Sequence, residues 1–162
     1  MVVLGLDPGP DYSAYVLLNG DGTIHTAAKR PNHDVLCAIK ADADRYTLTV
    51  VCERIRSYGM PAGASLFETC EWSGRFMEAW ISRDIRHNWY WIERKEVKMA
   101  LCGSTRAKDA NIRQALIDRY GGKDAAIGCK AKPGPLYGIK ADVWAALAVA
   151  VAWKDLQKVK VA

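Results

Sequence analysis

The amino-terminal run Val2-Val3-Leu4-Gly5-Leu6 is apolar throughout and ends at Asp7-Pro8-Gly9-Pro10. A short run that begins with β-branched residues and is bounded by turn residues is typical of a strand buried on both faces. Pro8 lacks the amide hydrogen that a central strand needs, and Gly9 tolerates the positive φ of a tight turn. The pattern therefore predicts a strand that delivers a carboxylate at its carboxyl end. Taken alone, Asp7 could equally be a residue that caps its own turn.

The pattern after this strand predicts alternating strands and helices in one domain spanning residues 1–162. The turn sequence Asn19-Gly20-Asp21-Gly22 joins expected strands at 12–19 and 23–28, which makes the first of three antiparallel strands central. A β-rich run at 47–52 ends on Glu53, a second acid delivered by a buried strand. Helices are expected at 32–43, 65–83, 107–120 and 139–156, a strand at 89–92 with an irregular continuation over 94–97, and a mobile loop at 122–138.

Charge and cysteine content limit the classes of partner. The formal net charge is +5, and many Lys and Arg residues lie in the middle of the chain and in the late loop, which favours a polyanionic partner. The five cysteines are scattered without a Cys-x-x-Cys pair, so we expect neither a disulfide framework nor a zinc site, and a cytoplasmic location. The chain begins directly with a strand and its apolar stretch at 141–153 is too short for a bilayer, so we expect neither a signal peptide nor a membrane partner.

Motifs spread along nearly the whole chain resemble, in their order, the RuvC-type Holliday junction resolvases, particularly those of bacteriophages. The motifs are Gly5-Leu6-Asp7-Pro8-Gly9-Pro10, Val50-Val51-Cys52-Glu53, Val97-Lys98 with Leu101-Cys102-Gly103, Ala107-Lys108, and Asp142 before Ala145-Ala146-Leu147-Ala148-Val149-Ala150. The resemblance implies the RNase H-like fold, an α/β fold with a five-stranded mixed sheet flanked by helices. It also implies a crossover junction endodeoxyribonuclease of DNA recombination and repair, in a bacterial cytosol or a phage-infected host.

The resemblance implies that Asp7, Glu53 and Asp142 are catalytic metal ligands for Mg²⁺ or Mn²⁺, with two ions per site. Such ions are hard cations that require oxygen ligands, and two of them can stabilise both the attacking and the leaving oxygen of a phosphodiester. Each acid also has a plainer interpretation. Glu53 could be a surface residue at the end of a strand, and Asp142 could simply interact with the dipole of a helix in its first turn.

One position departs from the implied pattern. The resemblance implies a further acid one helical turn after Asp142, where this chain has Ala145. Either three carboxylates suffice or a substitute exists, and Asp109 and Asp11 are unsupported candidates. The departure keeps open an alternative function, a catalytically compromised junction-binding protein of the same fold.

Basic residues and one helix complete the predicted site. By resemblance, Lys98 and Lys108 act near the scissile phosphate, where each would neutralise charge in the transition state. Other residues are candidates for DNA contacts, namely Arg75 and Arg106 along the backbone and Arg54, Arg56 and Tyr58 at the exchange point of a branched substrate. The helix at 65–83 is the implied homodimer interface, with Leu66, Phe67, Trp72 and Phe76 as contact residues or, more simply, as core.

A sugar kinase or another actin-like ATPase also begins with a strand that ends in an Asp-Gly turn. Those enzymes need a duplicated domain and a second phosphate loop, for which 162 residues leave no room.

Overall fold

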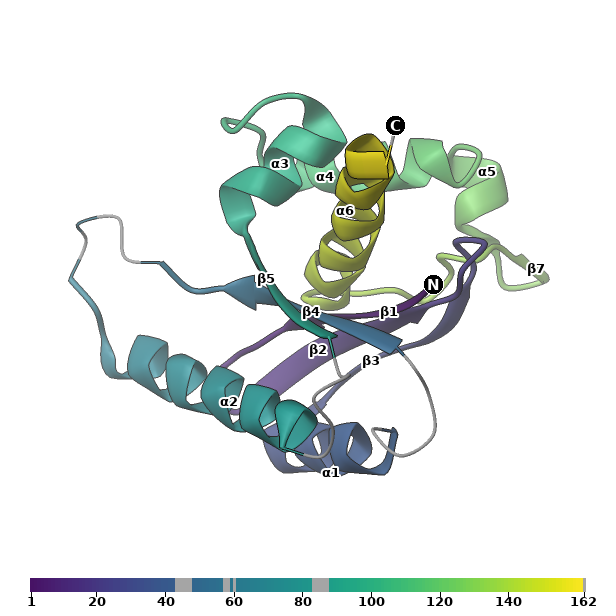
Figure 1. Ribbon diagram of the computed structural model, residues 1–162. Coiled ribbons are helices and arrows are strands. Elements are labelled where there is room, and N and C mark those ends of the chain that lie inside the picture. The colour runs from purple at the N-terminus through teal and green to yellow at the C-terminus, as the bar shows by residue number, and fades with distance from the viewer. Residues whose placement is uncertain (43–47, 57–58, 60, 83–87, 162) are drawn as a thin grey trace.

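The computed structural model describes all residues except 43–47, 57–58, 60, 83–87 and 162. Its centre is a five-stranded sheet in the order β3-β2-β1-β4-β5 (Figure 1). The strands are β1 (Val2–Asp7), β2 (Tyr12–Leu18), β3 (Ile24–Pro31), β4 (Leu48–Arg54) and β5 (Asn88–Glu93). The first three strands pair antiparallel, while β4 pairs parallel with both β1 and β5. The sheet is therefore mixed with β1 at its centre, as predicted.

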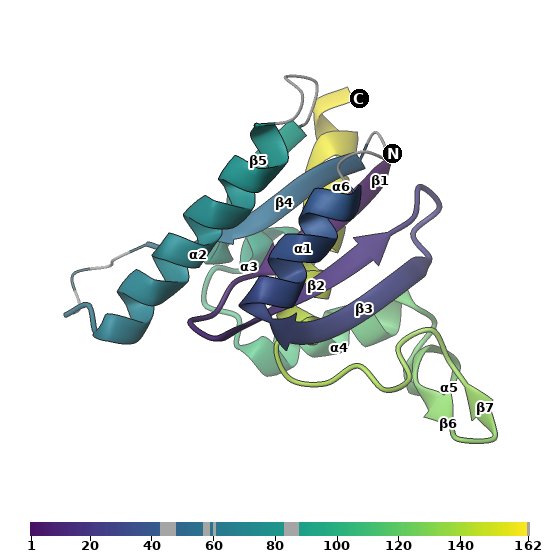
Figure 2. The ribbon, with the colours of Figure 1, turned by 90° about the horizontal axis from the view of Figure 1, so that it is seen from below.

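Helices cover both faces of this sheet (Figures 1 and 2). One face carries α1 (Asn32–Asp42) and α2 (Ala64–Ile81), and the other carries α3 (Arg94–Cys102), α4 (Asp109–Arg119) and α6 (Val143–Val161). Each face has its own apolar core. Leu4, Leu6 and Cys52 pack with α1 and α2, whereas Val3 and Val51 pack with α6. Among the described residues, no helix combines the length and apolar character that a bilayer span requires.

Helix α6 lies unusually close to the central strand. Gly5 of β1 faces this helix, and a Cβ atom added there would lie 2.4 Å from the carbonyl oxygen of Ala146 and 2.9 Å from Cβ of Ala150. Glycine on the strand and alanines on the helix thus allow the two backbones to approach. This contact sets the height of α6 above the strand that ends in Asp7.

Three sequence predictions require correction. Residues 94–97, expected to be irregular, belong to α3, whose first turn is closed by a hydrogen bond from the Glu93 amide to the Glu96 carboxylate at 2.7 Å. The loop expected at 122–138 contains α5 (Lys123–Ala126) and a hairpin of β6 (Gly128–Cys129) and β7 (Lys132–Pro133), with Ala126 and Leu136 buried. Helix α6, expected at 139–156 with Asp142 in its first turn, spans Val143–Val161 and so begins one residue after Asp142.

Candidate active site

Strand alternation directs Asp7 and Glu53 to the same face of the sheet. Val3 on β1 and Val51 on β4 both pack into the core under α6. Successive side chains on a strand point to opposite faces, so Asp7 and Glu53, four and two residues further along, point to the α6 face as well. The parallel register pairs Leu6 with Cys52, which brings the two acids side by side at the carboxyl ends of adjacent strands.

The start of α6 adds the third acid. The Asp142 carbonyl oxygen accepts hydrogen bonds from the amides of Ala145 and Ala146 at 2.9 and 3.1 Å, so Asp142 is the residue from which the helix starts. Ala141 before it has a φ of 44°, a left-handed conformation that is costly for a residue with a side chain. This backbone turn brings the Asp142 carboxylate to the edge of the sheet where β1 and β4 end.

The three acids predicted from the sequence line one cavity of about 300 Å³. Asp109 lines the same cavity. The remaining lining residues include two arginines and the position where a further acid is implied; they are Arg94, Ile112, Arg113, Ala141, Trp144 and Ala145. The structure thus brings Asp7, Glu53 and Asp142 together and adds Asp109 to them. Asp11, the other substitute considered for the missing acid, is exposed and is not among the residues that line this cavity.

The turn after Asp7 is held by buried hydrogen bonds. The side-chain amide of Asn32 donates to the carbonyl oxygens of Gly9 and Pro10, each at 2.9 Å. The hydroxyl of Ser13 donates to the Asn32 side-chain oxygen at 2.6 Å, and both of these polar residues are buried. Because buried polar groups are costly to leave unpaired, this network fixes the turn and with it the orientation of Asp7.

Burial disfavours the negative charge of two acids that line the cavity. The pKa of Asp7 is raised to about 7, first by burial and then by the nearby carboxylates of Glu53 and Asp142. Burial also raises the pKa of Glu53, although the neighbouring Arg94 acts in the opposite direction. Strongly perturbed carboxylates in a cleft are typical of functional sites.

Two basic side chains that sequence analysis did not select contact these acids. Arg94, the first residue of α3, donates to Glu53 at 3.1 Å and to Asp109 at 2.6 Å. Lys29 on β3 donates to Asp142 at 2.5 Å. The strand register explains Lys29, because Asp7 pairs with Ala14 and Ala14 pairs with Lys29 across the sheet. A regular register count from the Asn19–Gly22 turn would have placed Ala28 opposite Ala14 instead, because the β2–β3 pairing shifts by one residue between Leu17 and Leu18.

The donor set fits a hard divalent cation, because carboxylate oxygens are the ligands that Mg²⁺ and Mn²⁺ prefer. A cation would also relieve the repulsion that raises the pKa of Asp7. As the side chains stand, the described residues contain no group of three His, Cys, Asp or Glu close enough to hold an ion together. Glu53 and Asp142 are each bound to a basic side chain instead.

Two solved structures of RuvC from Thermus thermophilus are similar to this chain. The first has a TM-score of 0.69 and 18% sequence identity, and the alignment covers 99% of this chain and 97% of that one. The second, RuvC in complex with Holliday junction substrate, has a TM-score of 0.68 and 18% identity over 99% of this chain and 96% of that one. The chain has the RuvC fold. No protein-family model and no curated protein matches the sequence.

The basic residues expected from the resemblance to RuvC-type enzymes lie outside the cavity lining. Lys98 on α3 is half-buried, and with Arg94 it opposes the rise that burial causes in the pKa of Glu53. Lys108, whose amide donates to Asn111 at the start of α4, is exposed, as is Arg106. In contrast, Arg113 lines the cavity and stacks on Trp144 with 4.8 Å between the guanidinium carbon and the ring centroid.

The remaining candidates for DNA contacts lie elsewhere. Arg75 stacks on Trp72 of α2, on the face of the sheet opposite to α6. Arg54 stacks on Trp91, and Arg56 binds Glu93 at 3.0 Å. Tyr58 lies outside the described residues. The roles of these residues in the RuvC fold of this chain remain predictions.

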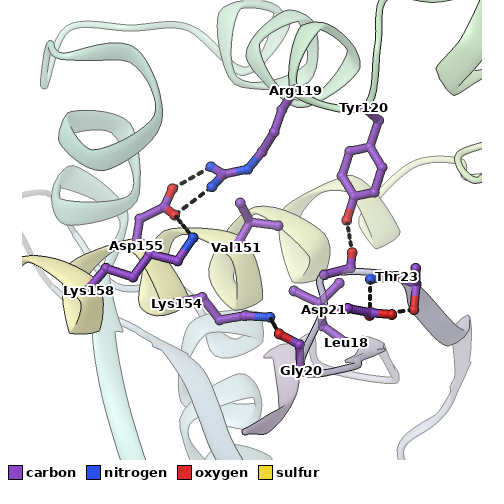
Figure 3. A pocket seen from close by; sticks show the side chains of 11 residues that line it. Leu18, Gly20, Asp21, Thr23, Arg119, Tyr120, Val151, Lys154, Asp155 and Lys158 are labelled. Carbon is purple, nitrogen blue, oxygen red and sulfur yellow. Dashed lines mark hydrogen bonds and ion pairs between the residues drawn. The ribbon is translucent and has the colours of Figure 1, made fainter.

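A second cavity, of about 390 Å³, lies at the other end of α6 (Figure 3). Here Arg119 of α4 binds Asp155 of α6 through both terminal nitrogens. Lys154 donates to the carbonyl oxygens of Asn19 and Gly20 at 2.8 Å, and the Tyr120 hydroxyl donates to Gly22 at 2.8 Å. These contacts attach α4 and the β2–β3 turn to α6, which gives the cavity a structural role.

Proposed function

We propose that this protein is an endodeoxyribonuclease that resolves four-way DNA junctions by divalent-metal-dependent hydrolysis of phosphodiester bonds. The observation that carries the proposal is the position of Asp7, Glu53 and Asp142 in one cavity. They come from β1, β4 and the start of α6 of a chain with the RuvC fold. The solved complex of Thermus thermophilus RuvC with its junction substrate supports the same choice of DNA over other polyanions.

In this proposal the three carboxylates would hold Mg²⁺ or Mn²⁺. The bound metal supplies Lewis acidity toward the phosphate and an activated water. The Asn32 network holds the turn that follows Asp7, so in this proposal the backbone that carries Asp7 keeps its position when DNA enters. Lys98 and Lys108 are the proposed residues that stabilise negative charge on the phosphate.

The DNA would approach over α3 and α4, where basic residues surround the cavity. Arg113 is held on Trp144 at its edge, and Arg106 and Lys108 are exposed at the start of α4. Phosphate contacts of this kind set position and affinity without reading sequence. Arg54, Arg56, Tyr58 and Arg75 are proposed as more distant contacts with the arms of a branched substrate. The proposed setting is the cytoplasm of a bacterium or of a phage-infected host.

We propose a homodimer formed through α2. Phe67 and Ile81 on this helix are 61% and 40% exposed, and Cys70 between them is exposed as well. These three residues lie on one face of the helix, together with the exposed Glu71 and Glu78, and form a stripe that a second copy would cover. Phe76, one of the candidate contacts, is fully buried in the core and is excluded from this interface. A homodimer also suits a junction, which presents two symmetry-related strands for cutting.

Light scattering at micromolar concentration tests the dimer. The expected mass is that of two chains, and Phe67→Glu should shift it toward one chain because it places a charge in the apolar stripe. Oxidation of Cys70 should cross-link the two copies, while Cys37→Ser, an exposed cysteine on α1, serves as the control. A monomer mass for the wild-type chain would exclude this interface.

The experiment that tests the function compares three synthetic substrates: a four-way junction, a three-way junction and a linear duplex. Cleavage of the four-way junction is expected with Mg²⁺ or Mn²⁺. Removal of the metal ion by EDTA should stop the reaction. Ca²⁺ should support binding without efficient turnover, because its coordination is looser. Equal cutting of linear duplex and four-way junction would contradict structure selectivity.

A second candidate is a junction-binding protein with compromised catalysis, favoured by one observation: Ala145 lines the cavity at the position where an acid is implied. Binding of four-way DNA without metal-dependent cutting would identify it. In that case Ala145→Asp should raise cleavage by a hundredfold or more, since residues three apart on a helix share a face. If three carboxylates suffice, the same change should alter the rate less than tenfold at saturating metal.

A further inference from the structure

Arg94 places a fixed positive charge inside the carboxylate cavity. One terminal nitrogen donates to Oε2 of Glu53 at 3.1 Å, and the other donates to Oδ1 of Asp109 at 2.6 Å. The side chain is only 29% exposed. Because a guanidinium is planar and always charged, a bridge between two carboxylates holds it in one place.

Lys29, the other basic residue in contact with the acids, is held less firmly. Its ammonium binds the single carboxylate of Asp142 at 2.5 Å, and its side chain is 41% exposed. An ammonium on a flexible stem can move into water at low cost. A cation that enters the cavity therefore displaces Lys29 from Asp142 more easily than it displaces Arg94 from Glu53.

The oxygens left for metal are few. Two neighbouring ions about 4 Å apart use shared and separate carboxylate ligands, beside the waters and substrate phosphate oxygens that complete their coordination. Here Oε2 of Glu53 is engaged by Arg94, Asp109 anchors Arg94, and position 145 contributes a methyl group. Asp7, Asp142 and the other oxygen of Glu53 remain, which is a ligand set for one ion.

The balance of charge leads to the same number. Four carboxylates and two guanidinium groups line the cavity, so once Lys29 has left Asp142 the lining carries two uncompensated negative charges when all groups are ionised. A single divalent cation neutralises them. In the chain without DNA, a second ion would leave the cavity positive and would stand beside the Arg94 guanidinium.

We propose that this site binds one divalent cation, between Asp7 and Asp142, and that Arg94 is the positive charge that takes the place of a second ion. Cation binding releases Lys29 from Asp142 and leaves the Glu53–Arg94–Asp109 bridge intact. The inference rests on the proposed function, since that function supplies the reason for a metal. It departs from the two ions that the resemblance to RuvC-type enzymes implies.

A titration of the metal-free protein with Mn²⁺ tests the number of ions without any measurement of cleavage. Electron paramagnetic resonance of free Mn²⁺ counts the ions bound per chain, and two ions that share a carboxylate also show magnetic coupling. The wild-type chain is expected to bind one ion. Lys29→Met should bind one ion about fivefold more tightly, because the competing ion pair is gone.

The Arg94 variants provide the decisive pair. Arg94→Gln should bind two ions, since Glu53 and Asp109 are then both available, whereas Arg94→Lys should bind one because the charge is retained. Arg94→Met is a second neutral variant in case Arg94→Gln does not fold, with thermal unfolding as the check. Asp109→Asn should still bind one ion, and loss of that ion would overturn the proposal by making Asp109 a ligand.

Two Mn²⁺ ions bound to the wild-type chain, or one bound to both neutral Arg94 variants, would overturn the inference. Parallel cleavage assays separate it from the proposed function. Cutting of four-way DNA with two ions bound would overturn the single-ion inference and support the function. One ion bound without any cutting would overturn the function and support the ion count.

Discussion

Acidic and basic side chains lie at both ends of α6, but they form neutral ion pairs and hydrogen bonds at one end and leave an excess of acids at the other. At the carboxyl end, Arg119 binds Asp155, and Lys154 binds two carbonyl oxygens of the β2–β3 turn. At the amino end, acids outnumber the basic residues that line the cavity, and burial raises the pKa of Asp7 to about 7. The first end attaches elements to one another. The second retains charge that the protein itself does not neutralise, which is the property a cation-binding site needs.

The largest contrast between the two ends should come from removing one acid at each. Asp7→Asn is expected to lower the cleavage rate of a four-way junction at least a thousandfold while binding of the junction is largely kept, because the change removes charge but little shape. Glu53→Gln and Asp142→Asn should behave alike. Asp155→Asn, the matched control at the other end, should leave cleavage unchanged. Single-turnover assays give the rates, and cutting by Asp7→Asn above a tenth of the wild-type rate would contradict the role of Asp7.

Stability against pH should sharpen the comparison. The pKa of Asp7 is about 7 in the folded protein and near 4 in the unfolded chain, so the folded state binds more protons between these values. The contribution of Asp7 to the free energy of unfolding therefore falls as pH rises from about 4 to about 7. Asp7→Asn lacks this loss. The free energy of unfolding of the variant minus that of the wild type should therefore increase by about 2–3 kcal/mol between pH 5 and pH 8.

Urea denaturation in EDTA measures this difference at each pH. Addition of Mg²⁺ at pH 8 should stabilise the wild type and not Asp7→Asn, because only the wild type binds the ion in this interpretation. A constant difference between the two proteins across this pH range would show that Asp7 titrates normally.

At the carboxyl end, Arg119→Gln should reduce stability by about 1 kcal/mol, because a two-nitrogen ion pair at a partly exposed position is lost. Cleavage should stay within twofold of the wild type. Denaturation and cleavage measured on the same preparation test both statements. A large loss of activity in a folded Arg119→Gln variant would mean that the second cavity takes part in function.

The smallest expected effect concerns the backbone before Asp142. Ala141→Gly should relieve the left-handed conformation and raise stability by roughly 0.5–1 kcal/mol, since glycine adopts a positive φ without steric cost. Ala125→Gly, in the short helix α5, is a control in which the added freedom should destabilise. Equal effects of both substitutions would exclude strain at position 141.

The acids on the strands could be predicted because their signals are local. Apolar runs that end on Asp7 and Glu53 indicate both the strand and the direction of the carboxylate. Lys29 could not be predicted in the same way, because its place depends on the register of three strands.

The helical part of the site was harder to predict. In α3 only Val97 is buried, so its apolar pattern is too weak to predict a helix and to place Arg94 at its first position. The segment 122–138 has the same difficulty, since the buried side chains of Ala126 and Leu136 are too far apart in sequence to form a period. The acids of the site could thus be predicted from the sequence, whereas the basic residues that contact them could not.

The close contact of Gly5 with α6 has a consequence for how activity is lost. Asp7 ends β1 and Asp142 directly precedes α6, and the backbones of these two elements touch, so the separation of the two acids cannot drift without opening the core beneath α6. Local fluctuations that open loops and termini leave such a pair in place. Amide hydrogens of β1 and of the first turns of α6 should therefore exchange only through global unfolding, and the ion-binding capacity of the chain should disappear in the same cooperative transition as its secondary structure.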